Sequence, residues 1–160
     1  MDMEVKQLSV RKSITVNAPV AHVFRTFTAN QNDWWPRSHH IGKSDRFTAI
    51  VEPHVGGRWF ERTDDGNECD WGRVLVWEEP KRIVLSWDLN AEFRYDPTLN
   101  TEVEVLFIAE TPRRTRVELE HRGLERYGDK AAAMRDMYDA PNAWAGILAS
   151  MRDQVEKSLA

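Results

Sequence analysis

The sequence has little of what disulfide-bonded, metal-binding or membrane proteins need. Cys69 is the only cysteine among 160 residues, so no disulfide can form within the chain, and a thiolate metal cluster would need other ligands. No run approaches the roughly 20 apolar residues that cross a bilayer, and the opening MDMEVKQLSV lacks the apolar core of a signal peptide. These absences predict a cytoplasmic protein that is neither exported nor bound to a membrane.

An excess of basic charge is also missing. The net charge is −4, and the lysines and arginines are scattered rather than gathered into a patch that could hold a phosphate backbone. Nucleic acid is therefore not an expected partner. The chain is 41% hydrophobic and 30% charged, which is typical of a folded domain. Its length predicts a single domain over residues 1–160, with residues 1–8 as a loosely ordered lead-in.

The first regular elements are a strand and a short helix. Residues 10–16 alternate between apolar and polar side chains, which indicates a half-buried strand. Pro19 is tolerated in the first turn of a helix, and Asn17 is expected to cap that helix. The apolar residues that follow recur at the spacing of one helix face: Val20, Val23, Phe24 and Phe27. The stretch NDWWPRSHHIG comes directly after this helix.

Several strand candidates follow, separated by turns that contain Gly, Pro, Asn or Asp. They are residues 46–52, 58–63, 71–77, 82–88, 101–109 and 115–121. Most of the separators are short, which favours antiparallel hairpins over parallel crossovers. In the last two strands apolar residues alternate with glutamates, so we expect one face of the sheet to be wet and the other to be covered.

The cover is predicted at the C-terminus. Its apolar residues recur at helical spacing: Trp144, Ile147, Leu148, Met151, Val155 and Leu159. Asp139 and Pro141 mark a plausible start of this helix, and residues 123–140 are expected to form a short helix over the edge of the sheet. The sequence therefore predicts an α+β fold in which one curved antiparallel sheet of about seven strands is covered by a long C-terminal helix.

Four stretches resemble one known family: residues 14–28, 55–60, 71–87 and 115–124. Together they are similar to the SRPBCC proteins, a START-like and birch-pollen-allergen-like superfamily, in the branch homologous to the C-terminal domain of the activator of the heat-shock-protein-90 ATPase. The resemblance implies the helix-grip fold, with two short helices after the first strand and a cavity between the sheet and the C-terminal helix. Proteins of this shape include carriers, stress regulators, cyclases and dehydratases, so the fold does not fix the function.

Aromatic residues supply most of the candidate ligand-binding positions, because aromatic-lined hollows are typical of small-molecule sites and the chain holds seven tryptophans. His39 and His40 are expected near the entrance of the cavity. Adjacent residues in extended chain point to opposite sides, and no metal-binding spacing occurs, so neither a metal nor a cofactor is predicted. The candidate ligand-binding residues are Trp34, Trp35, Trp59, Glu61, Trp87, Tyr95, Phe107, His121, Tyr138, Trp144 and Leu148.

His121 is the candidate catalytic residue, because it continues the apolar face of the last strand and matches a histidine of the family pattern. An imidazole at the end of a cavity could hydrogen-bond a ligand or act as a general acid or base. The alternative is a core histidine whose hydrogen bonds are satisfied within the fold. Glu61 is a candidate interior acid, although Trp59 and Phe60 leave open which face of strand 58–63 is buried.

Three functions are compatible with these features. The first is a binding module that holds a small hydrophobic or aromatic molecule without turnover. The second is an enzyme of polyketide cyclase, dehydratase or hydrolase type that uses His121 as acid or base. The third is a chaperone-binding role like that of the ATPase activator, although the eukaryotic activator carries a further domain for which 160 residues leave no room. A homodimer through an exposed sheet edge or aromatic patch is compatible with all three.

Overall fold

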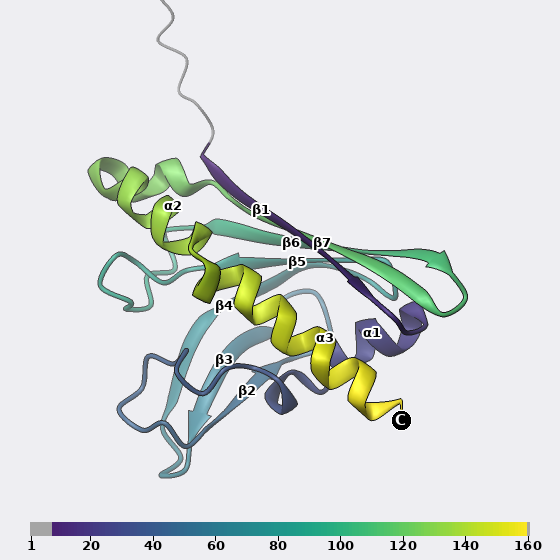
Figure 1. The fold of residues 1–160 in the computed structure, drawn as a ribbon. Helices are drawn as coiled ribbons and strands as arrows, with labels where there is room; N and C mark the ends of the chain where they lie inside the picture. The colour runs from purple at the N-terminus through teal and green to yellow at the C-terminus, as the bar shows by residue number, and fades with distance from the viewer. Residues whose placement is uncertain (1–7, 160) are drawn as a thin grey trace, which may run out of the picture.

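The computed structural model describes residues 8–159, so nearly all of the expected lead-in lies outside the described residues. Seven strands and three α-helices make up the fold (Figure 1). The strands are β1 (Ser9–Val16), β2 (Phe47–Val51), β3 (Arg58–Thr63), β4 (Glu68–Glu78), β5 (Arg82–Trp87), β6 (Thr101–Thr111) and β7 (Arg114–Arg122). The α-helices are α1 (Val20–Phe27), α2 (Ala131–Asp139) and α3 (Gly146–Ser158); 3₁₀ turns lie at Gln31–Asp33 and Leu124–Lys130, and a π-type turn at Pro141–Ala145.

All seven strands form one antiparallel sheet in the order β1-β7-β6-β5-β4-β3-β2. Strands β2 to β7 are neighbours in sequence order, as the short turns predicted, and β1 pairs with β7 at the far edge. The sheet curves around α3, which crosses it from α2 to the C-terminus (Figure 1). The predicted α+β helix-grip fold is confirmed.

The two faces of β6 and β7 differ as the alternation predicted. Val105 pairs with Leu119, and both are buried on the face that α3 covers. The opposite face carries charged pairs: Glu104 accepts a hydrogen bond from Arg122 at 2.9 Å and a second one from Arg82. These ion pairs are partly exposed, so each adds little stability by itself. Their main effect is to keep that face of the sheet charged and in contact with solvent.

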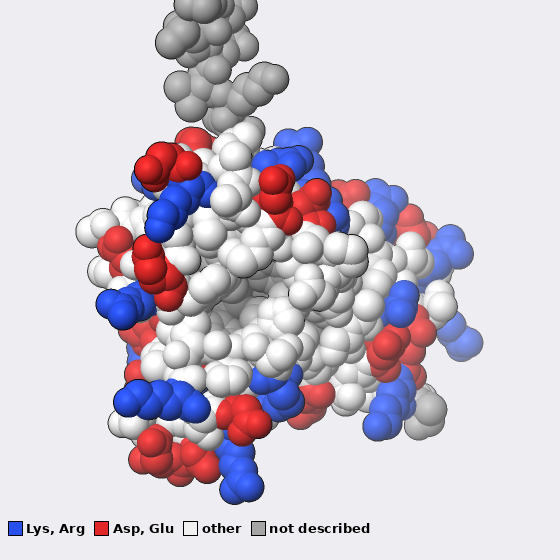
Figure 2. All heavy atoms as spheres, turned by 60° about the vertical axis from the view of Figure 1, so that its left-hand side comes forward, with Lys and Arg blue, Asp and Glu red and all other residues white. Residues whose placement is uncertain are grey.

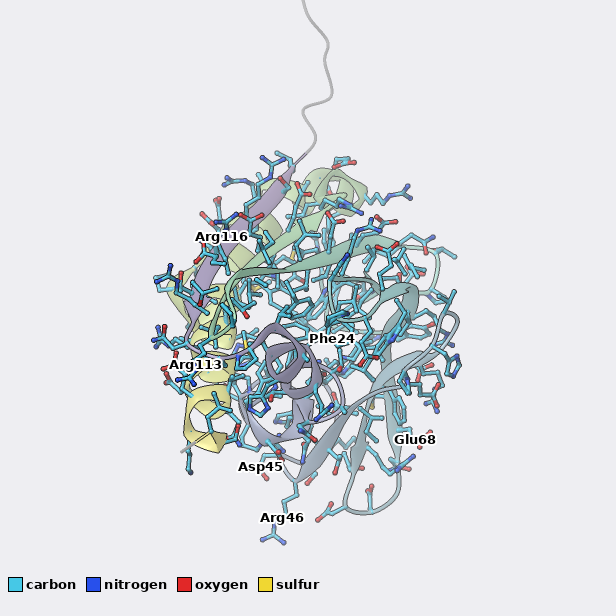
Figure 3. The ribbon with its side chains drawn as sticks, turned by 90° about the vertical axis from the view of Figure 1, so that its right-hand side faces the viewer. Phe24, Asp45, Arg46, Glu68, Arg113 and Arg116 are labelled. Atoms are coloured by element: carbon cyan, nitrogen blue, oxygen red, sulfur yellow. The ribbon has the colours of Figure 1, made fainter. Side chains whose placement is uncertain are left out.

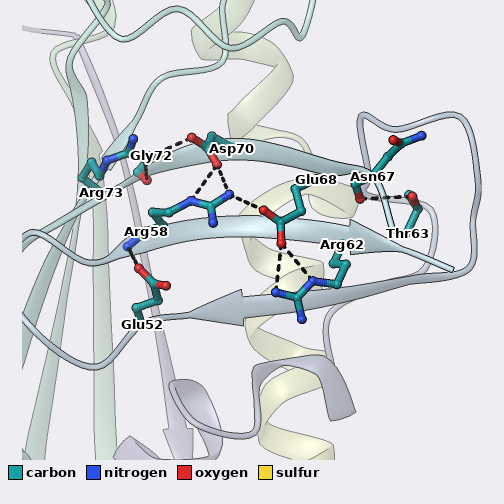
Figure 4. Close-up of polar contacts among 9 residues, drawn as sticks. All are labelled: Glu52, Arg58, Arg62, Thr63, Asn67, Glu68, Asp70, Gly72 and Arg73. Carbon is teal, nitrogen blue, oxygen red and sulfur yellow. Dashed lines mark hydrogen bonds and ion pairs between the residues drawn. The ribbon is translucent and has the colours of Figure 1, made fainter. Parts of the chain in front are cut away.

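A β-bulge explains why strand β3 does not show a period of two. The register with β4 shifts between Trp59 and Phe60, and both residues are buried. Trp59 packs inside against other tryptophans. Phe60 lies under the guanidinium of Arg58, whose carbon is 3.9 Å from the ring centroid. Figure 4 shows that Arg58 in turn bonds Glu68 and Asp70 of β4.

The ends of two helices differ from the prediction. Asn17 does not cap α1; its backbone N–H donates to the carboxylate of Glu156 in α3 at 2.8 Å, and Pro19 occupies the cap position without a side-chain bond. The predicted cap is therefore wrong. The C-terminal helix begins at Gly146, after the π-type turn, and Leu159 lies just beyond its end with an exposed fraction of 48%.

Helix α1 fills one end of the curved sheet. Phe24 and Phe27 pack edge-on against Phe107 of β6, with ring centroids 5.0 and 5.5 Å apart. Figure 3 shows Phe24 in the middle of the molecule, whereas Arg113 and Arg116 lie at its edge. The apolar stripe of α1 thus closes this end with aromatic rings. The opposite end, where α2 and the loop after β5 lie, is where the structure is hollow.

Candidate functional site

A cavity of about 350 Å³ opens at the end of the sheet opposite α1. Figure 2 shows a hollow among uncharged side chains, with charged residues around its edge. The walls come from the segment after the first 3₁₀ turn, β4, β5, the loop after β5, α2, the π-type turn and α3. The lining residues are Trp35, Ser38, His39, His40, Ile41, Trp71, Trp87, Leu89, Phe93, Met137, Tyr138, Asn142, Ala143, Trp144 and Ile147.

Four tryptophans form a continuous aromatic wall of the cavity. The ring centroids of Trp35 and Trp71 are 5.1 Å apart, and those of Trp87 and Trp144 are 5.4 Å apart. The two pairs are in contact with each other, because the ring centroids of Trp35 and Trp144 are 6.3 Å apart. These are normal spacings for interacting aromatic rings. The wall offers apolar aromatic surface rather than charge to a molecule that enters the cavity.

A first chain of hydrogen bonds runs behind this wall. Tyr127 donates its hydroxyl hydrogen to the carbonyl of Leu89 at 2.6 Å, so it must accept in its 3.0 Å bond with Tyr138. Tyr138 therefore donates to Tyr127 and accepts from the indole N–H of Trp87 at 3.0 Å. Burial raises the pKa of Tyr138 to about 12. Both tyrosines are neutral near pH 7, and their hydrogens are already used.

A second chain fixes the state of His121. Thr101 donates to the carbonyl of Trp87, so its oxygen must accept from Nε2–H of His121 at 3.1 Å. The Nδ1 atom of His121 then accepts the indole N–H of Trp144 at 3.1 Å. Burial lowers the pKa of His121 to about 3. The ring is thus neutral, with both nitrogens bonded.

The mouth of the cavity carries a different pair of histidines. His39 donates from Nε2 to the carbonyl of Asn142 at 3.1 Å, because a carbonyl can only accept, and its Nδ1 accepts from the Ser38 hydroxyl at 2.9 Å. This bond joins the segment after the first 3₁₀ turn to the π-type turn before α3. His40 donates from Nδ1 to the carbonyl of Gly42 at 2.9 Å. Both residues line the cavity.

Glu61 is buried but does not line the cavity. Its Oε1 accepts the backbone N–H of Ile41 at 2.7 Å and the indole N–H of Trp71 at 2.9 Å. Its Oε2 accepts the backbone N–H of Gly42 at 3.1 Å. The carboxylate therefore holds the segment that carries His40 against strands β3 and β4. These bonds give Glu61 a positioning role in the structure.

The structure brings some of the predicted ligand residues together and separates others from the cavity. Trp35, Trp87, Tyr138 and Trp144 line it. Trp34, Trp59, Glu61, Phe107, His121 and Leu148 are buried in the core, and Tyr95 packs over the side chain of Arg73; none of these seven lines the cavity. His121 and Trp59 lie directly behind the wall, since each contacts the ring of Trp87.

Sequence reasoning missed two groups of lining residues. Trp71 is one of the seven tryptophans, but strand 71–77 has apolar residues on both of its faces, so the sequence does not indicate which face is buried. Phe93 and Met137 are exposed by 37% and 39% at the mouth, on a loop and a helix whose position the sequence did not give. Phe93 holds a left-handed backbone with φ of 56°, which is unusual for a bulky residue. An aromatic residue in the long loop LNAEFRYDPTLN was the available signal.

Two kinds of site are absent from residues 8–159. No three His, Cys, Asp or Glu side chains in that range lie close enough to hold a metal ion. No helix in the same range is long and apolar enough to span a membrane. The candidate functional site is the hollow lined by the four tryptophans.

Comparisons with known proteins agree with this architecture. The chain is 38% identical to an anthrahydroquino-gama-pyrone synthase, Txn09, solved in complex with SUM; 96% of this chain and 99% of that chain are covered, with a TM-score of 0.65. It is 32% identical to the self-sacrificing resistance protein CalC from Micromonospora echinospora, over 94% and 96% of the two chains, with a TM-score of 0.71.

A more distant structure shares the fold alone. The Aha1 dimer from Colwellia psychrerythraea is 18% identical, covers 93% of this chain and 96% of that chain, and has a TM-score of 0.60. A search of curated proteins found no match. The model of one family matches residues 17–156. The chain therefore belongs to the family described as activator of Hsp90 ATPase homolog 1-like proteins, as the sequence motifs indicated.

Proposed function

We propose that this protein binds a planar aromatic small molecule in the cavity between the sheet and α3. The observation that carries the proposal is the wall of four tryptophans, which is aromatic, apolar and open at one end. A cavity of about 350 Å³ falls within the size range of small-molecule sites. The two relatives above 30% identity, a synthase and a resistance protein, support a ligand-binding role for this chain.

Burial of the ligand's apolar surface would supply most of the affinity, at about 2.5 kcal/mol for each 100 Å² removed from water. The wall needs little rearrangement, because the indole N–H groups of Trp35, Trp71, Trp87 and Trp144 all have partners within the fold. Preformed sites of this kind avoid much of the cost of ordering side chains on binding. Flat rings should therefore bind better than flexible chains of equal apolar area.

A titration of tryptophan fluorescence with anthraquinone and with an aliphatic carboxylic acid of similar apolar area tests the proposal. We expect saturable quenching by anthraquinone and a much weaker response to the aliphatic acid. Ala143→Phe places a ring in the cavity and should weaken anthraquinone binding by at least tenfold. Ala149→Phe is the matched control, because Ala149 is also half-buried in the C-terminal helical segment but does not line the cavity. Equal affinity in both variants would overturn the site.

A ring-closing enzyme is the second candidate, and the 38% identity to a synthase over nearly the whole chain favours it. Its test is product formation from an uncyclised aromatic polyketide with protein present at one-hundredth of the substrate concentration. More than one equivalent of product per protein would establish turnover. If the compound saturates the cavity and no product forms, the enzyme function is excluded and only the binding function stands. His121 is not our candidate for the proton carrier, since both of its nitrogens are bonded in the core.

A further inference from the structure

Among the side chains that line the cavity, His40 carries a ring nitrogen that can accept a hydrogen bond and that no residue of 8–159 uses. The chains behind the wall use the hydrogens of Tyr127, Tyr138 and Thr101. His39 at the mouth has both ring nitrogens bonded. The amide of Asn142 is exposed, and no hydrogen bond to another residue of 8–159 holds it. His40 differs from all of these.

The tautomer of His40 follows from its single bond. Nδ1 lies 2.9 Å from the carbonyl oxygen of Gly42, so Nδ1 carries the hydrogen and Nε2 of the neutral ring carries a lone pair. Nε2 makes no hydrogen bond to any residue of 8–159. No buried side-chain nitrogen or oxygen in that range lacks a partner. Nε2 is therefore reachable from solvent, on a residue that lines the cavity.

Neighbouring strands hold this imidazole in position. Glu61 of β3 binds the backbone N–H groups of Ile41 and Gly42, the two residues that follow His40. A Cβ at position 42 would lie 2.9 Å from Oε2 of Glu61, so a larger residue there would require this carboxylate to shift. The His40 ring packs on Phe47 of β2, with centroids 5.3 Å apart. The ring that carries the acceptor is thus held in position, on a residue that lines the cavity, before any ligand arrives.

We propose that His40 recognises a hydroxyl group on the aromatic ligand, by accepting its hydrogen bond at Nε2. This deepens the binding function proposed above and rests on it. An aromatic wall selects an aromatic ring, and an unused acceptor on a residue that lines the same cavity selects a donor on that ring. An aromatic hydroxyl is a stronger donor than an alcohol, whereas a methoxy group in its place would leave Nε2 without a partner. The ligand class is therefore hydroxylated aromatics.

The test compares 2-hydroxyanthraquinone with 2-methoxyanthraquinone by isothermal titration calorimetry. One hydrogen bond contributes about 1 kcal/mol, so the wild-type protein should bind the hydroxyl compound about fivefold more tightly. His40→Phe keeps a ring over Phe47 and should reduce this ratio to about one. His54→Phe is the matched control, because exposed His54 also bonds a carbonyl through Nδ1 but does not line the cavity. Asn142→Ala should also keep the ratio.

The outcomes separate the two proposals. If the wild-type protein binds neither compound, the binding function fails and the role of His40 falls with it. If both compounds bind equally, or if His40→Phe keeps the fivefold ratio, binding stands and the role of His40 is overturned. Long-range ¹⁵N–¹H NMR of the wild-type protein keeps the test decisive even if His40→Phe does not fold. The Nε2 resonance of His40 should shift with the hydroxyl compound and stay in place with the methoxy compound.

Discussion

At the scale of single residues, the polar chemistry of this protein depends on which hydrogens are already used. His121 could be named from the sequence as an inward-facing histidine, and it does lie on the buried face of β7. Its hydrogen-bond partners Thr101 and Trp144 come from β6 and from the π-type turn before α3. Only the assembled fold brings these three together. The residue type was thus predictable, whereas its neutral, fully bonded state was not.

Acid pH should reveal His121 through stability. Its pKa is about 3 in the folded protein because of burial, while an unfolded histidine titrates near 6.5. Between these values the unfolded chain binds a proton that the folded chain does not, so stability falls as pH falls. His121→Gln, which keeps a donor and an acceptor, should remove up to about 1.4 kcal/mol per pH unit from this dependence.

Urea unfolding at several pH values between 7 and about 4 measures the difference between the two proteins. His54→Gln is the control, since His54 is exposed and its removal should leave the wild-type slope nearly unchanged. If the stability of His121→Gln depends on pH as strongly as that of the wild type, His121 takes up a proton in the folded protein as readily as in the unfolded chain. That result would contradict the hydrogen-bond chain described above.

At the scale of elements, periodic patterns predicted more than irregular segments did. The alternation in β6 and β7 placed their buried residues correctly, and the stripe of α1 did so for Val23, Phe24 and Phe27, whereas Val20 is only half-buried. The buried face of strand β3 could not be predicted in this way. A bulge turns Trp59 inward, and arginine side chains cover Phe60 on the other face. The mouth of the cavity consists of loop, turn and helix ends without a period. His39 and His40 could be expected there from the sequence, whereas Phe93 and Met137 came only from the structure.

Removal of the charge of Glu61 should loosen the segment that carries His40. A glutamine at position 61 can accept at one atom only, so it cannot keep the bonds to Ile41, Gly42 and Trp71 together. Loss of one bond to a charged acceptor costs about 1.5–3 kcal/mol. We expect Glu61→Gln to speed amide hydrogen exchange at position 41 or 42 by at least about tenfold.

The matched control is Glu52→Gln. Glu52 also accepts a hydrogen bond from a backbone N–H, that of Arg58 at 2.7 Å. Unlike Glu61, it is half-buried, and it makes no hydrogen bond to residues 40–42. Glu52→Gln should leave the amide hydrogen exchange of residues 41 and 42 at the wild-type rate. Unchanged exchange in Glu61→Gln would show that the segment is held by other contacts, and would weaken the argument that His40 is fixed in advance.

At the scale of the whole molecule, the cavity joins parts of the chain that are distant in sequence. Trp35 follows the first helix, Trp71 and Trp87 come from the middle of the sheet, and Trp144 precedes α3. A ligand that touches all four would therefore stabilise the domain as one unit rather than a single loop. Such a ligand binds the folded state and not the unfolded chain, so it raises the free energy of unfolding.

The size of this effect can be stated in advance. A free ligand concentration of 100 times Kd adds about 2.7 kcal/mol, which for a chain of this length corresponds to a rise in Tm of about 5–10 °C. Thermal unfolding followed by near-UV circular dichroism should show one transition that moves upward with ligand concentration. Ala143→Phe, which should bind at least tenfold more weakly, should show at most about half of this shift at the same ligand concentration, whereas Ala149→Phe should follow the wild type. The opposite result would be two transitions in the circular dichroism signal, of which one moves with ligand and the other stays at the ligand-free Tm. It would mean that the cavity is not coupled to the whole sheet.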